Sequence, residues 1–355
     1  MSIVFSHTTA LEILRDSALG PRIAKARVAM ALDGTIPNMD VIAAALSHIG
    51  VALSGENSVE VAYLGASGAH GGGARVAHRY SAALPAGSIL RIVDGIGVAS
   101  PELLLLQIAA YATELELTLL TCELCGLYSL SDGAEYGLVQ RKSPLTTKDK
   151  ILAYLEQCPS RSRSNKVRGA VDHACEMSGS PRESMLYLCF TLPRRLGGYG
   201  VPVLSMNESI ELARLGDLFG VRRERRPDLV LSLPDGDRPG VCVEYAGAPH
   251  LGQGRPQLDD LRQNELMAAG FSPYTVWGDQ YNSMNYMDDL VDNVIRGRLG
   301  LPRRRPGEKR LAIERAQRDL LLCELNAIDG HTWGTSQSSP EYLSLLARVA
   351  EAKAA

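Results

Sequence analysis

Two acidic residues lie at opposite ends of two neighbouring apolar segments of this 355-residue chain. Asp228 opens the segment that continues Leu-Val-Leu, and Glu244 follows the segment Val-Cys-Val. Between them, Pro, Asp and Gly residues predict a hairpin turn. A hairpin would bring the two carboxylates together at one end, and a hard divalent cation would relieve their repulsion. The pattern therefore predicts a metal-dependent phosphodiesterase site.

A run of arginines stands directly before Asp228. Runs of this kind are most often solvated surface, but this one lies where a phosphate backbone would have to pass for cleavage. Phosphate contacts position a nucleic acid without reading its sequence. The sequence therefore predicts DNA contacts from Arg222, Arg223, Arg225 and Arg226.

The acidic pair has to be positioned by the elements around it. Apolar periodicity and turn residues predict a domain over residues 169–300. Its expected elements are a helix (181–195), three strands (201–211, 225–233 and 240–246), a helix (257–269), a strand (273–277) and a helix (286–298). The sequence therefore predicts an α/β domain with a mixed sheet flanked by helices.

Short motifs follow this order of elements. They are Ser180-Pro-Arg-Glu183, Arg226-Pro-Asp228, Val243-Glu244-Tyr-Ala-Gly-Ala-Pro-His250 and Asp259-Asp-Leu-Arg262. On these motifs, residues 178–278 resemble the very-short-patch-repair-like endonuclease domain of the PD-(D/E)XK superfamily. The resemblance implies a restriction-endonuclease-like fold that hydrolyses phosphodiester bonds of DNA with Mg²⁺ or Mn²⁺.

The resemblance also implies roles for individual residues. Asp228 would be the main metal ligand, Glu244 would share the metal or orient the attacking water, and Glu183 would add a third carboxylate as ligand or base. His250 would donate a proton or contact a phosphate, and Arg262 would bind a phosphate. In-line cleavage needs little beyond a metal ion and good positioning.

These assignments have simpler structural alternatives. Glu183 stands three residues after Ser180, which is the spacing of a capping box, and Asp228 at a strand start could cap a turn. A loop histidine such as His250 is usually exposed and idle. Glu244 is the exception, because a carboxylate inside an apolar run is costly unless something pairs with it.

Two positions depart from the family pattern. Ala246 occupies the place of the usual lysine, two residues after Glu244, and alanine can neither bind metal nor transfer a proton. Thr275 stands where relatives tend to place an arginine, and Pro273 weakens the same strand. Two interpretations stay open: an endonuclease impaired by Ala246, or a non-catalytic DNA-binding regulator of antitoxin type with a degenerate nuclease fold.

Apolar periodicity and helix-start residues predict an α+β accessory domain over residues 1–140. Its expected elements are strands at 59–64, 74–79 and 89–98 and helices at 39–49 and 101–112. The segments Phe5-Ser-His7-Thr-Thr-Ala10, Val76-Ala-His78-Arg79 and Gly95-Ile-Gly-Val98 loosely resemble the AbiEi-type antitoxin and regulator family. A protein partner for this domain stays open. The sequence spacing of the histidines is not that of metal ligands in the set His7, His70, His78 and His173.

Basic residues interleaved with Ser and Pro predict a linker over 141–168, with a short helix near 148–157. A second basic linker is expected at the start of 301–355. A charged helix (308–327) and a frayed end would follow it.

Composition sets the broad class. A formal net charge of −3 and 45% hydrophobic residues are ordinary for a globular protein, so any DNA contact must be local. The first residues lack the pattern of a signal peptide, and no apolar run reaches membrane-spanning length. Seven scattered cysteines fit reduced thiols. We therefore expect a cytoplasmic protein with no membrane association.

Overall fold

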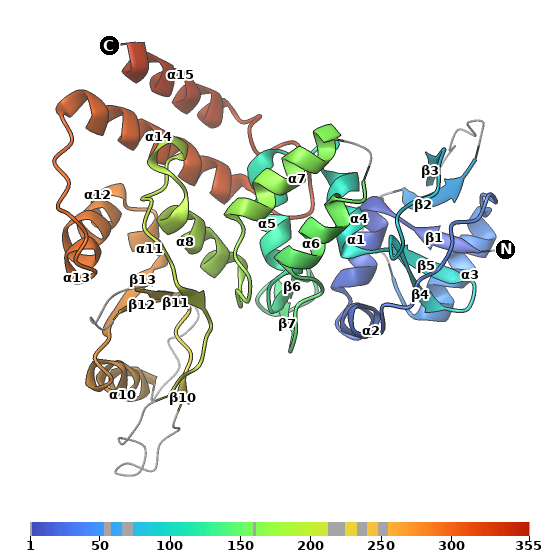
Figure 1. The fold of residues 1–355 in the computed structure, drawn as a ribbon, viewed down its shortest axis with the longest axis horizontal. Helices are drawn as coiled ribbons and strands as arrows, with labels where there is room; N and C mark the ends of the chain where they lie inside the picture. Colours follow the sequence, from blue (N-terminus) through green and yellow to red (C-terminus); the bar gives the residue numbers. More distant parts are fainter. Residues whose placement is uncertain are drawn as a thin grey trace. The chain divides into compact units, whose positions relative to one another are not determined.

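The computed structural model describes residues 2–52, 58–65, 74–158, 161–211, 224–232, 240–247 and 255–354. The chain forms two compact units (Figure 1). Unit 1 comprises Met1–Glu176 and Gly330–Gly334, and unit 2 comprises Met177–Asp329 and Thr335–Ala355. Each unit combines helices with a mixed sheet, which confirms the predicted α/β class at this level. Within the described ranges, no helix is long and apolar enough to cross a membrane.

Among the described residues of unit 1, five strands form a sheet in the order β3-β2-β1-β5-β4. They are β1 (Ile3–Phe5), β2 (Val59–Leu64), β3 (Arg75–Tyr80), β4 (Ile89–Val93) and β5 (Ile96–Ala99). The pairs β1–β5 and β2–β3 are parallel, and the pairs β1–β2 and β4–β5 are antiparallel. The stretch 89–98, expected as one strand, is a tight hairpin because Gly95 adopts a left-handed conformation (φ 77°) at its turn.

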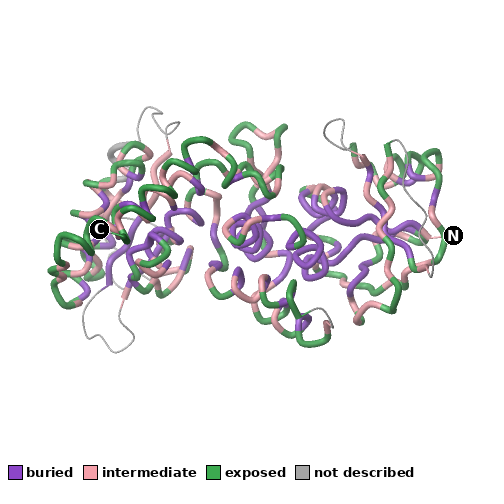
Figure 2. Tube along the Cα trace, turned by 90° about the horizontal axis from the view of Figure 1, so that it is seen from above, coloured by how far each residue is buried: buried purple, intermediate pink, exposed green. Residues whose placement is uncertain are grey.

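Helices and a small hairpin complete unit 1. The helices are α1 (His7–Arg15), α2 (Leu19–Ala26), α3 (Met39–Ile49), α4 (Pro101–Ile108), α5 (Glu114–Leu124), α6 (Lys148–Leu155) and α7 (Arg161–His173), and the hairpin pairs β6 (Tyr128–Leu130) with β7 (Leu138–Gln140). α4 is buried all round, as its apolar sequence predicts. Buried residues gather in the interior of each unit (Figure 2).

The stretch 141–168, expected to be mostly linker, belongs to the core of unit 1. α6 and α7 contribute Ile151, Leu155, Val167 and Val171 to that core at helical spacing. Arg141 is also buried, where it donates a hydrogen bond to the backbone oxygen of Gly126 at 3.1 Å. The division between the units therefore falls after Glu176 rather than within 141–168.

Unit 2 contains a mixed sheet that, over the described residues, has four strands in the order β13-β12-β11-β8. They are β8 (Ser205–Met206), β11 (Leu229–Leu231), β12 (Val241–Ala246) and β13 (Ser272–Trp277). β11 is antiparallel to both neighbours, whereas β12 and β13 are parallel and joined through α10 (Arg255–Ala268). Pro273 is tolerated because β13 lies at the sheet edge.

Helices pack against this sheet. α8 (Pro181–Thr191) lies against β12, and α10 lies against β13. Leu266 of α10 packs on Val230 and Cys242. Because side chains alternate along a strand, Glu244 shares the face of Cys242 and is directed towards α10. Beside the sheet, β9 (Ile210–Glu211) pairs with β10 (Glu224–Arg225).

The C-terminal part of unit 2 is helical and compact. Its elements are α11 (Gly278–Tyr281), α12 (Met284–Asp288), η2 (Asp289–Ile295), α13 (Arg296–Arg298), α14 (Glu308–Ala327) and α15 (Pro340–Ala354). α14 has the bounds of the predicted charged helix. The expected tail instead forms α15, which packs along α14 (Figure 1).

A buried carboxylate ties α14 to the surrounding segments. Glu314 is 5% exposed and pairs with Arg304 at 2.8 Å, Arg310 at 3.1 Å and Arg194 of η1 (Arg194–Leu196) at 3.4 Å. Burial by itself would raise the pKa of Glu314. The hydrogen bonds from Arg304 and Arg310 outweigh burial and lower this pKa to about 2.

We predict that Glu314→Gln destabilises unit 2 at neutral pH. A carboxylate whose folded-state pKa is depressed stabilises the fold above its unfolded-state pKa of 4.5, and this stabilisation is lost as the pH falls through about 2. The variant should lose about 1–2 kcal/mol of unfolding free energy at pH 7, and its difference from the parent should shrink below pH 4.5. Urea unfolding across pH measures both, with exposed Glu351→Gln as control. A pH-independent difference would contradict the prediction.

Candidate functional site

The acidic pair predicted from the sequence meets at one end of the β11–β12 hairpin. β11 and β12 pair antiparallel, with Leu229 opposite Val243. Extending this register by one residue places Asp228 opposite Glu244. The Asp228 Oδ2 atom also accepts a hydrogen bond from the Tyr245 backbone N–H at 2.7 Å. Strand pairing therefore anchors Asp228 at the start of β11.

Asp228 lies in the electrostatic field of the other two predicted ligands. Burial raises the pKa of Asp228 well above its ordinary value, and the Glu183 and Glu244 carboxylates raise it further. The Tyr245 N–H and the Arg262 guanidinium oppose this rise without cancelling it. The fold thus brings Glu183, Asp228 and Glu244 into one acidic neighbourhood.

Glu183 is held at the N-terminus of α8. The Ser180 hydroxyl accepts a hydrogen bond from the Glu183 N–H at 3.2 Å, and Glu183 Oε2 accepts one from the Gly179 N–H at 2.7 Å. The capping alternative weighed from the sequence is therefore present, reaching Gly179 rather than Ser180. The same carboxylate is close enough to Asp228 for its charge to raise the Asp228 pKa, so the capping contacts hold Glu183 near the site.

Asn207 is a site residue that sequence reasoning missed. Its side-chain amide donates to Glu183 Oε2 at 2.7 Å, and its backbone N–H donates to the Asp228 backbone oxygen at 3.1 Å. Asn207 has a left-handed backbone (φ 50°), which asparagine tolerates better than most residues. The sequence signal that could have indicated this role is the position of Asn207 among turn-forming residues, just after an apolar segment.

Glu244 pairs with a cation supplied by α10. Arg262 Nη2 lies 2.8 Å from Glu244 Oε1, and it also donates a hydrogen bond to the Arg226 backbone oxygen at 2.9 Å. Glu244 stands where β12 leaves the core, and its side chain keeps 21% of its exposure. The ion pair and partial exposure together relieve the cost of a carboxylate in an apolar strand.

The predicted DNA-binding arginines differ in their surroundings. Arg225 pairs with the buried Glu265 at 2.5 Å, so its charge is already compensated. Arg226 is 67% exposed and lies 4.0 Å from Glu224. Both arginines and Arg262 line one depression of about 580 Å³. Outside the described residues lie Arg222, Arg223 and His250, together with the Asp259 side chain.

The three carboxylates share one electrostatic neighbourhood, but their oxygens are too far apart to bind a single metal ion without movement. Among the residues that the structure describes, ligand atoms of Glu183, Asp228 and Glu244 do not all lie within 4.8 Å of one another. A single ion shared by all three would require side-chain rotation. Such rotation is feasible because Glu244 is partly exposed and Glu183 is held mainly through one oxygen.

Ala246 and Thr275, the two positions at which the sequence departs from the resemblance, lie near this group. Ala246 is partly exposed and stands opposite Trp277 of β13. Because its side chain is a methyl group, it adds no polar atom to the site. Thr275 stands opposite Glu244, and its hydroxyl accepts a hydrogen bond from the Gln263 side chain at 3.3 Å. The described site is thus rich in carboxylates, with Arg262 as the cation that reaches Glu244.

We predict that Asp228→Asn stabilises unit 2 at neutral pH. The folded-state pKa of Asp228 is raised, so the folded protein binds this proton more tightly than the unfolded chain does. The free energy of unfolding therefore falls as the pH rises from the unfolded-state pKa of 3.8 to the folded-state pKa. Asparagine removes the buried charge and can still accept the Tyr245 N–H. We expect a gain of about 1 kcal/mol at pH 7 that disappears in acid. Urea unfolding at both pH values, with exposed Asp260→Asn as control, measures it; an equal gain in acid would refute the assignment.

Comparison with known proteins assigns the chain to no family. No protein-family model matches it, and neither a curated protein nor a solved structure gives a match. The function of the site is therefore argued from its geometry and chemistry.

Proposed function

We propose that unit 2 is a metal-dependent DNA endonuclease domain of restriction-endonuclease-like fold. The observation that carries the proposal is the meeting of Asp228 and Glu244 on adjacent antiparallel strands, in the field of Glu183 from α8. The order of elements supports it: α8, then the antiparallel β8, β11 and β12, then α10 and the parallel β13. This is the order of helices and strands expected for such a domain.

The donor set fits Mg²⁺ or Mn²⁺. Hard divalent cations prefer oxygen ligands, and all three side chains are carboxylates. Asp228 and Glu244 would hold the ion from two adjacent strands, with Glu183 as the third ligand. Such an ion, when bound, lowers the pKa of a coordinated water and neutralises charge on the phosphate.

The arginines of the depression supply the phosphate contacts. Arg226 presents an exposed guanidinium, and Arg262 is placed between Glu244 and the Arg226 backbone. A guanidinium stays protonated, so it neutralises a phosphate and cannot act as a base. Proton acceptance from the attacking water therefore falls to a carboxylate, and Glu244 is the partly exposed one on β12.

A second function, a non-catalytic DNA-binding regulator, is favoured by two observations. Ala246 offers neither a metal ligand nor a proton at the position of the usual lysine. Glu244 is already paired with Arg262 at 2.8 Å, which reduces its need for a metal ion. In this case the arginines would hold the DNA backbone, and binding would weaken steeply with salt.

We predict that the chain nicks DNA with Mg²⁺ or Mn²⁺ and that Asp228→Asn lowers the rate at least ~100-fold, because asparagine is a poorer metal ligand. Supercoiled plasmid, mismatched duplex and single-stranded DNA serve as substrates. Asp260→Asn, an exposed aspartate on α10, is the matched control and should retain full activity.

Each result separates the two functions. Cleavage that Asp228→Asn leaves unchanged would place the activity outside this site. No cleavage by the parent, combined with salt-sensitive DNA binding that Arg226→Ala weakens, would establish the regulator instead.

We also predict that Ala246→Asp raises nicking at least ~10-fold, because it adds a carboxylate beside Glu244 that can bind metal or a proton. Ala246 is partly exposed, so the new side chain has room. Initial nicking rates of Ala246→Asp and of the apolar control Ala246→Val, which adds bulk without a carboxylate, measure the effect. An equal rate in both variants would show that the missing polar group is not what limits the site.

A further inference from the structure

A separate group of potential metal ligands lies in unit 1. His7 begins α1 directly after β1, Glu60 lies on β2 and His78 lies on β3. β2 pairs with both β1 and β3, so neighbouring strands deliver residues that are far apart in the sequence. One ligand atom from each side chain lies within 4.8 Å of the other two.

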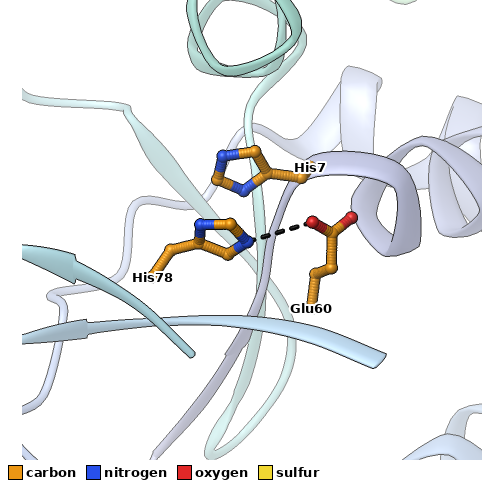
Figure 3. A group of neighbouring side chains, drawn as sticks. All are labelled: His7, Glu60 and His78. Atoms are coloured by element: carbon orange, nitrogen blue, oxygen red, sulfur yellow. Dashed lines mark hydrogen bonds and ion pairs between the residues drawn. The ribbon is translucent and has the colours of Figure 1, made fainter. Parts of the chain in front are cut away.

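The three side chains form a compact cluster. Figure 3 shows the His7 imidazole over that of His78, with the Glu60 carboxylate beside them. The ring centroids are 3.5 Å apart, with an interplanar angle of 21°. His78 Nε2 lies 3.0 Å from Glu60 Oε1. His7 is buried, whereas the side chains of Glu60 and His78 keep 15% and 28% of their exposure. The cluster can therefore be reached from solvent.

Neighbouring groups orient the carboxylate. Glu60 Oε2 accepts hydrogen bonds from the Thr8 backbone N–H at 2.7 Å and from the Thr8 hydroxyl. The Glu60 backbone N–H in turn donates to the Thr9 hydroxyl at 3.0 Å. These contacts fix one oxygen of Glu60 and leave Oε1 directed at the imidazoles. Such outer contacts around a carboxylate are typical of metal sites.

The backbone of His7 is held in an unusual conformation. Its φ of 50° is left-handed, which is uncommon for a residue with a side chain. The His7 N–H donates to the buried Gln107 Oε1 at 2.9 Å, and Gln107 Nε2 donates to the Tyr80 hydroxyl at 2.8 Å. Strain of this kind persists where surrounding contacts enforce it. Here it places the imidazole over His78.

We propose that His7, Glu60 and His78 form a binding site for one divalent transition-metal ion of the zinc class. Two imidazoles and one carboxylate suit Zn²⁺, Co²⁺ or Ni²⁺ better than Mg²⁺. Metal–ligand bonds of about 2.0–2.2 Å separate two ligands of a tetrahedral ion by roughly 3.3–3.6 Å. Ligand atoms within 4.8 Å of one another reach this separation by small side-chain rotations. Three protein ligands leave one position for water or an anion.

The test titrates Zn²⁺ and Co²⁺ into the reduced full-length chain carrying Asp228→Asn, so that the unit 2 site does not contribute. Calorimetry should show one Zn²⁺ per chain, and Co²⁺ should give visible ligand-field bands without a thiolate charge-transfer band. His78→Gln and Glu60→Gln should weaken binding at least ~100-fold, more than the loss of an outer contact would. His48→Gln, which changes an exposed histidine on α3, should bind as the parent does.

Circular dichroism and thermal unfolding establish that each variant is folded. Gln at the half-exposed position 78 is expected to be tolerated, so lost binding can be distinguished from lost structure. No stoichiometric Zn²⁺ binding by the Asp228→Asn chain would overturn the proposal and leave Glu60–His78 as a hydrogen-bonded pair only. Equal binding by His78→Gln, or a thiolate band with Co²⁺, would also overturn it, placing the metal elsewhere.

Discussion

The antiparallel register between β11 and β12 is the constraint on which the candidate site of unit 2 depends. It sets Asp228 opposite Glu244 and lets the Tyr245 N–H bind the Asp228 carboxylate. A slip by one residue would send each strand's side chains to the other face and separate the pair. The buried Val230 and Cys242, packed on Leu266 of α10, resist such a slip because it would expose them. The apolar face of the sheet thus fixes the positions of its acidic residues.

Holding carboxylates together has an electrostatic cost, and unit 2 distributes that cost over several partners. Asn207 binds Glu183, Arg262 pairs with Glu244, and Asp228 keeps the least compensated charge. Elsewhere in unit 2, arginines pair with buried carboxylates, as Arg225 does with Glu265 and Arg304 with Glu314. These arginines therefore compensate buried charge within the fold, which fits a chain whose net charge of −3 gives no global signature of nucleic-acid binding. A divalent ion at Asp228 would supply compensation that the protein's own groups leave incomplete.

Local sequence patterns predicted elements best where the pattern was strong and uninterrupted. The charged helix over 308–327 and the strand over 59–64 have the predicted bounds, because helical periodicity and β-branched residues mark them clearly. The linker predicted over 141–168 contains more structure than expected. α6 lies within the short helix predicted near 148–157, but basic and small residues hide the apolar positions of α7, and only the packing of both helices shows that they belong to a core. The pair Asp228 and Glu244 was predictable because a hairpin joins residues that are close in sequence.

The sequence by itself determined the strongly patterned elements, the α/β class and the hairpin that carries the acidic pair, since each depends on residues within a short stretch. Tertiary structure decided which distant side chains meet. It brought Glu183, Asn207 and Arg262 to the hairpin, and it stacked His7 on His78 beside Glu60. Spacing along the chain carries no sign of the second group, because parallel and antiparallel pairing of β1, β2 and β3 sets those distances. The energy of strand pairing and core burial, spread over whole elements, selects that arrangement.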